Sequence, residues 1–167
     1  GYIVMGAALA TPLAASGAAL HIAAHGAGKI TLFFCAGAIY VAHHLTDIKD
    51  MNGLGRTMPI TYGAFALAAL SIMGVPPLAG AWSKFMLMGG ALDNGYLVVL
   101  GVLMVSSLLN LVYLGEIILR GFFASPSHKW DGVQEAPLAM LIPLSITALL
   151  SLLLFFTVDF LMIDFGG

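Results

Sequence analysis

Three titratable side chains recur at four-residue intervals within one apolar stretch of the sequence. They are His21, His25 and Lys29, and their neighbours in residues 20–34 are mainly alanine, glycine, isoleucine, leucine and phenylalanine. Four residues are slightly more than one helical turn, so we expect these side chains to form a buried stripe along one helix. Histidine exchanges protons near neutral pH, and lysine does so readily when it is desolvated. The stripe therefore predicts a proton-transfer chain whose gaps of about 6 Å must be bridged by water or a hydroxyl group.

A second lysine, Lys84, follows a break in another apolar stretch. The break spans residues 74–80, where Pro76 and Pro77 remove backbone donors and stop helical continuation. In lipid, such a break is tolerated only where it is buried in protein or lines a wet cavity. A lysine near the middle of a membrane costs about 2.5–3.5 kcal/mol, so the presence of both Lys29 and Lys84 indicates a function. Two alternatives remain open: the histidines could simply bond backbone carbonyls, and Lys84 could extend to the membrane surface.

The composition identifies the solvent that surrounds these residues. Of the 167 residues, 60% are hydrophobic and 8% are charged, and the mean hydropathy is +1.02. Soluble domains carry about 25% charged residues, so the chain is expected to be an integral membrane protein. The net charge of -2 excludes a basic nucleic-acid surface. With the single cysteine Cys35 and no zinc, phosphate-loop or dinucleotide motif, the sequence predicts neither a metal nor a cofactor.

The apolar runs predict an all-α fold: a polytopic transmembrane helical bundle with one proline-broken discontinuous helix. Residues 1–167 are expected to form a single membrane domain that begins with the end of one helix. That helix end is expected at 1–11, and the spans at about 14–42, 58–93 with its break at 74–80, 96–120 and 137–158.

The distribution of charge bears on whether residues 58–93 cross the membrane once or twice. A single crossing places all the loop-side basic residues on one face and the acidic residues on the other. These are Lys49, Arg56, Arg120 and Lys129 against Asp93, Asp159 and Asp164. The positive-inside rule therefore favours one interrupted crossing, with loops 43–57 and 121–136 in the cytoplasm.

The span at 96–120 carries further polar residues. Glu116 and Arg120 stand four residues apart near its end, which is typical of an interfacial ion pair. Ser106, Ser107 and Asn110 could either hold helices together or line a wet channel, and the sequence does not choose between these roles.

Taken together, these motifs resemble the antiporter-like membrane subunits of respiratory complex I, membrane-bound hydrogenases and Mrp-type cation/proton antiporters. The resemblance covers residues 1–123, and its wording is most similar to the D-type Mrp subunit. The motifs that carry it are His21, His25, Lys29, Leu32-Phe33 and Gly37, then Gly53-Leu54 and Met58-Pro59, then Gly74, Pro76-Pro77 and Gly80, and finally Lys84. The Ala-Trp before Ser83-Lys84 departs from the more usual Gly-Phe.

The resemblance implies that the chain is the C-terminal part of a longer subunit built from two inverted repeats of five helices. His21, His25 and Lys29 would form a central hydrated axis, and Lys84 would be the terminal proton site. The implied function is proton or cation/proton translocation, within a redox-driven pump of the NADH:quinone oxidoreductase or hydrogenase type or within an Mrp-type antiporter. The driving reaction, and with it any enzyme activity, is left open.

The expected partners are other membrane subunits, the lipid bilayer and protons, with Na+ as a second candidate ion and no nucleic acid. The expected location is the inner membrane of a bacterial or archaeal cell. An alternative interpretation is a non-conducting structural half-subunit that anchors a membrane complex. A small-solute transporter is favoured less, because the chain lacks an internal repeat.

Overall fold

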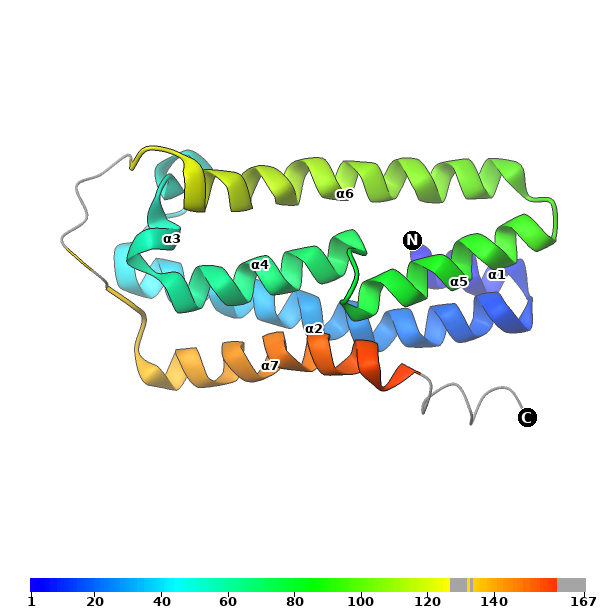
Figure 1. The fold of residues 1–167 in the computed structure, drawn as a ribbon, viewed down its shortest axis with the longest axis horizontal. Helices are drawn as coiled ribbons and strands as arrows, with labels where there is room; N and C mark the ends of the chain where they lie inside the picture. The colour runs from blue at the N-terminus through cyan, green and yellow to red at the C-terminus, as the bar shows by residue number, and fades with distance from the viewer. Residues whose placement is uncertain (127–131, 133, 159–167) are drawn as a thin grey trace.

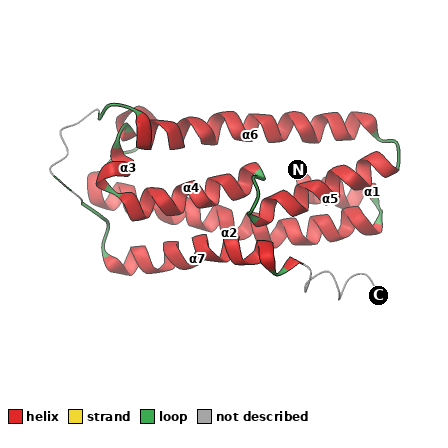
Figure 2. Cartoon of the chain, in the orientation of Figure 1, coloured by secondary structure: helices red, strands yellow, loops and turns green. Residues whose placement is uncertain are grey.

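The computed structural model describes residues 1–126, 132 and 134–158, and all regular structure in this part of the chain is helical (Figure 1, Figure 2). The elements are α1 (Tyr2–Leu9), α2 (Pro12–His43), the 3-10 helix η1 (Ile48–Met51), α3 (Leu54–Thr57), α4 (Pro59–Met73), α5 (Ala79–Asp93), α6 (Leu97–Phe123) and α7 (Leu138–Phe156). Three of them, α2, α6 and α7, are long and apolar enough to cross a membrane. The predicted all-α class with one broken helix is confirmed.

The central helix of the bundle is α2, which packs against α1, α4, α5 and α7. It begins at Pro12 because the Thr11 side chain accepts a hydrogen bond from the Ala14 amide, 3.1 Å away. Glycines let neighbouring helices approach α2 closely: a Cβ at Gly17 would lie 2.8 Å from the Met86 Cβ. Gly28 likewise packs against α4, where a Cβ would lie 3.0 Å from the Ile72 Cγ1.

Helices α4 and α5 lie end to end across the bundle, so residues 58–93 cross it once rather than folding as a hairpin (Figure 1). Helix α4 ends at Met73 and is capped by Gly74, whose φ of +87° is in the left-handed region that glycine tolerates. The Gly74 amide donates to the carbonyls of Leu70 and Ser71, both at 3.1 Å. Helix α5 then begins at Ala79, which leaves a short non-helical connection near the middle of the bundle.

The start of α5 fits tightly against the end of α4. A Cβ at Gly80 would fall on the carbonyl group of Ser71, too close for any real contact. The side chain of Ser71 is itself buried. Because the obstacle is backbone, the neighbour cannot rotate away, and only glycine at this position allows the two half-helices to meet.

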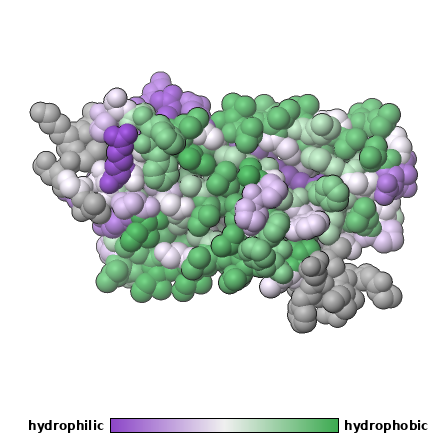
Figure 3. Space-filling model, in the orientation of Figure 1, coloured by the Kyte–Doolittle hydropathy of each residue, from purple (hydrophilic) through white to green (hydrophobic). Residues whose placement is uncertain are grey.

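Apolar side chains cover most of the long sides of the bundle, and hydrophilic residues lie at its ends, most visibly at the end that carries α3 (Figure 1, Figure 3). At this end the Gly53 amide donates to the Arg120 carbonyl at 3.0 Å, and Arg56 Nε donates to the Phe122 carbonyl at 3.3 Å. Helix α5 ends at Asp93, and α5 runs towards the opposite end of the bundle from α3 (Figure 1). The other charged residues that bear on the predicted sidedness, Lys129, Asp159 and Asp164, lie outside the described residues.

The segment before α7 is tied to the beginning of α4 by one carboxylate. Glu135 Oε1 accepts from the backbone amides of Ile60 and Thr61, and its Oε2 accepts from the Thr61 hydroxyl at 2.7 Å. Amides at a helix start have no partner within the helix, and the positive end of the helix dipole favours a negative charge there. Glu135 therefore caps the first half of the broken helix.

Candidate functional site

His21 connects the central helix α2 to the second half of the broken helix. Its ring is buried, and Nδ1 lies 2.9 Å from the Ser83 hydroxyl of α5. The Ser83 hydroxyl also donates to the Gly80 carbonyl at 3.1 Å. Since serine has a single hydroxyl proton, both bonds can form together only if His21 Nδ1 is the donor. In the neutral ring this leaves Nε2 as the proton acceptor.

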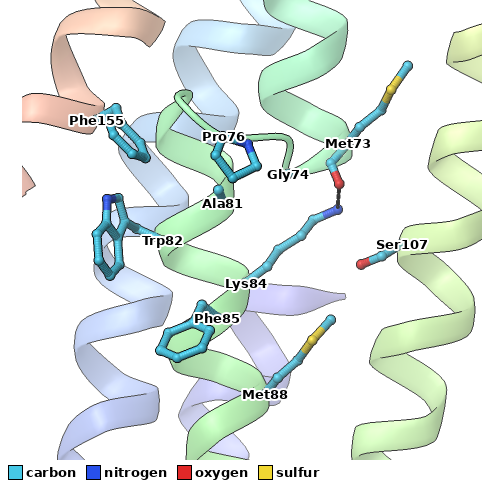
Figure 4. Close-up of a pocket in the computed structure, with 10 residues that line it drawn as sticks. All are labelled: Met73, Gly74, Pro76, Ala81, Trp82, Lys84, Phe85, Met88, Ser107 and Phe155. Carbon is cyan, nitrogen blue, oxygen red and sulfur yellow. Dashed lines mark hydrogen bonds between the residues drawn. The ribbon is translucent and has the colours of Figure 1, made fainter.

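Lys84 is buried at the break between α4 and α5. Only 5% of its surface is exposed, and Nζ donates to the Met73 carbonyl at 2.9 Å (Figure 4). The last carbonyls of a helix lack intrahelical partners and carry the negative end of the helix dipole. The break therefore supplies an acceptor for the lysine inside the bundle, and the side chain does not extend to a membrane surface.

A cavity of about 240 Å³ brings three of the four predicted residues together. His21, His25 and Lys84 line it, and the His21 and His25 rings stack with centroids 5.3 Å apart. Its lining also includes Ser106, Asn110 and Tyr113 of α6. At about 30 Å³ for each water molecule, the volume is sufficient for several waters. Ser106 and Asn110 are therefore placed as a polar lining and not only as contacts between helices.

A second cavity, of about 630 Å³, also borders Lys84 and is mainly apolar. Trp82, Phe85 and Phe155 form part of its wall, with the rings of Trp82 and Phe85 directed away from the lysine amine (Figure 4). Lys84 lines both cavities. The lysine thus stands between a polar chamber and an apolar one, and the polar chamber is the side that suits proton exchange.

The stripe predicted on α2 is not uniformly buried. His21 is buried, His25 is half-buried and Lys29 is exposed on the surface of the described chain. The expectation that Lys29 is buried within this chain is wrong, for a geometric reason. A four-residue step exceeds one turn by about 40°, so a side chain eight residues along is rotated by about 80° from the first. Lys29 therefore faces away from the cavity that His21 enters.

Two residues of the site are not apparent from the sequence pattern. Ser83 stands directly before Lys84 in the sequence, but neighbouring residues of a helix do not face each other, and its contact with His21 comes from the packing of α5 on α2. Tyr2 lines the same cavity from α1 and packs on the His21 ring with centroids 5.0 Å apart. No spacing pattern connects Tyr2 with either residue, so only the packing of α1 reveals it. The Glu116–Arg120 ion pair was predicted, and it is confirmed by an N···O distance of 2.7 Å.

The chain is similar in sequence to a known protein family and to several of its members. Residues 1–110 match the family described as NADH:quinone oxidoreductase/Mrp antiporter, transmembrane. The chain is 43% identical over 122 residues to NADH-quinone oxidoreductase subunit N of Desulforudis audaxviator, covering 73% of this chain and 24% of that protein. It is 33% identical over 159 residues to the D-type Na(+)/H(+) antiporter subunit of Alkalihalophilus pseudofirmus, covering 95% of this chain and 32% of the relative.

The fold has a close counterpart among solved structures. A chain of the Mrp complex from Dietzia sp. DQ12-45-1b superimposes with a TM-score of 0.87 at 23% identity, covering 99% of this chain and 39% of that one. At that identity the likeness describes the fold alone. The chain spans between 24% and 32% of the length of the two curated relatives above, so it corresponds to a part of each of them.

Proposed function

The chain belongs to the NADH:quinone oxidoreductase/Mrp antiporter transmembrane family, and from this membership we propose that it conducts protons across a membrane. It is an integral membrane protein with a broken helix at its centre. The observation that carries the proposal is the polar cavity in which His21, His25 and Lys84 meet. A buried lysine and two histidines around a space that can hold water are suited to proton transfer. Ionisable side chains within a membrane cost free energy, so their presence there indicates a function.

The proposed route runs from Lys29 through His25 and His21 to Lys84. Lys29 lies one helical turn beyond His25 on the exposed face of α2, where it would receive a proton from a neighbouring part of the assembly. The stacked histidines and water then carry it into the cavity. The Nε2 atom of His21 serves as acceptor, and Lys84 takes the proton and later releases it as its amine alternates between charged and neutral forms.

Because the chain spans only part of its relatives, we propose that it works together with other membrane subunits of a multisubunit complex. The relatives bear the names of a quinone oxidoreductase subunit and a sodium/proton antiporter subunit, so protons are the proposed substrate and Na+ a second candidate. The proposed location is the inner membrane of a bacterial or archaeal cell. The end of the bundle that carries Lys49, Arg56 and Arg120 would face the cytoplasm.

The function is tested by replacing Lys29 with glutamine in the native membrane complex. We expect proton flux into liposomes, followed with a pH-sensitive dye, to fall by about tenfold or more, because the residue that loads the histidines is lost. Lys49→Gln, which removes a lysine from η1 outside the helical spans, is the matched control and should leave the flux unchanged. Normal flux in Lys29→Gln would favour the alternative of a non-conducting structural subunit.

Replacement of Ser83 tests the role assigned to the histidine. In Ser83→Ala, His21 Nδ1 loses its partner, the Nε2 acceptor is no longer enforced, and we expect proton flux to fall roughly threefold to tenfold. Ser151→Ala is the control: that serine is also buried and bonds a backbone carbonyl, but it stands in α7 away from the cavity. Nitrogen NMR of the His21 ring should show a mixture of tautomers in Ser83→Ala only. Equal flux in the two alanine variants would contradict the assignment.

A further inference from the structure

Tyr2 connects helix α1 with the helices that surround the polar cavity. It stands at the start of α1, and its hydroxyl lies 2.9 Å from the Ser107 hydroxyl and 3.2 Å from the Leu103 carbonyl, both on α6. These two contacts fix the outer end of the side chain. The aromatic ring is thereby held across the space between α2 and α5.

The aromatic ring of Tyr2 contacts two groups of the proposed proton route. Its centroid is 5.0 Å from that of the His21 ring, and Lys84 Nζ lies over the Tyr2 ring at 5.2 Å from its centroid. Tyr2 is therefore in contact with the donor and the acceptor of the last transfer step.

The ring contact distinguishes the two protonation states of the lysine. A lysine ammonium has three N–H donors, and within the described residues one of them is taken by the Met73 carbonyl. The face of an aromatic ring attracts an ammonium through its quadrupole but has no comparable attraction for a neutral amine. The attraction is stronger for a cation that is largely removed from bulk solvent, and Lys84 is buried.

We propose that Tyr2 is a positioning residue that holds the charged form of Lys84 between its ring and the Met73 carbonyl. The proposal rests on the proton conduction proposed above. In this arrangement the ring retains the proton on Lys84 after its transfer from His21 and opposes its return. The Tyr2 hydroxyl acts indirectly, by keeping the ring in place against α6.

The test varies the ring electrostatics at position 2 while its shape is kept. Tyr2→Phe provides the reference, and 3,4,5-trifluorophenylalanine at the same position has nearly the same volume but a much weaker negative face. Both variants are measured in the native complex reconstituted into liposomes. We expect the proton flux of the fluorinated variant to be about fivefold or more below that of Tyr2→Phe. Tyr2→Leu, which removes the ring, should lower flux roughly fivefold to thirtyfold relative to Tyr2→Phe.

Tyr62 provides the control, because it is a buried tyrosine that packs against Phe65 and Phe122 outside the cavity. The same phenylalanine and trifluorophenylalanine pair at that position should give equal flux. Equal flux for the pair at position 2, together with loss of flux in Lys84→Gln, would overturn this inference and leave the proposed function intact. Normal flux in Lys84→Gln would instead overturn the proposed function.

Discussion

Replacing Lys84 with glutamine is expected to lower proton flux by at least about a hundredfold. Glutamine keeps an N–H donor in a side chain one bond shorter than that of lysine, but it cannot take up or release a proton. Lys84→Arg should be equally inactive, because arginine keeps its proton throughout and cannot complete the cycle. Flux is measured by dye in liposomes that contain the native complex.

The pair of Lys84 variants separates conduction from a structural role. A lysine that only anchored the end of α4 by its charge would be replaced adequately by arginine, and Lys84→Arg would then conduct normally. Native gels should find both variants assembled in the complex. Lys49→Gln again provides a control for the loss of one positive charge. Wild-type flux in Lys84→Arg would eliminate the lysine as a proton carrier.

The second large effect is expected at the junction of the two half-helices. In Gly80→Ala the new methyl group meets the Ser71 carbonyl, so the start of α5 must move away from α4. Such overpacking typically costs about 1–3 kcal/mol and more where backbone is the obstacle. The movement would also separate Lys84 from the Met73 carbonyl and shift Ser83 from His21. Both a lower unfolding temperature in detergent and a strong loss of flux are therefore expected.

Gly63→Ala is the matched control for this substitution. Gly63 lies within α4, and a Cβ there meets nothing within 4 Å. Alanine is favoured over glycine inside a helix by up to about 1 kcal/mol, so this variant should be unchanged or slightly more stable. If Gly80→Ala had the same unfolding temperature and the same proton flux as Gly63→Ala, close contact between α4 and α5 would not be a requirement of the fold.

Much of the fold follows from patterns that are local in the sequence. Apolar runs of sufficient length predict the helices, Pro59 is placed at the start of α4 as its type suggests, and the charge distribution favours a single crossing for 58–93. The cap supplied by Glu135 could not be predicted in this way. Its partners, Ile60 and Thr61, belong to a helix far away in the sequence, and no periodicity connects them.

The sequence predicts those site residues whose type is unusual in an apolar span. It does not predict the residues that reach the site only through the packing of the helices. A lysine or histidine in an apolar span is conspicuous, so the amino-acid sequence alone is sufficient to single out His21 and Lys84. The four-residue spacing shows that Lys29 is rotated by about 80° from His21 around α2. Only the packing of α2 against its neighbours decides which of these two directions is buried. Tyr2 looks like any aromatic residue of an apolar helix, and its role depends on the position of α1 beside α5.

The acceptor of Lys84 has a consequence for genetics. Because the bond goes to the backbone carbonyl of Met73, the partner of the lysine is specified by the path of the chain and not by any side chain. Substitution of Met73 by another apolar residue would keep the carbonyl acceptor. Alanine scanning would therefore not detect the contribution of this carbonyl. Comparisons of related genes would likewise record the lysine without a visible counterpart. An amide-to-ester replacement that weakens this one carbonyl is the kind of chemistry that would reveal it.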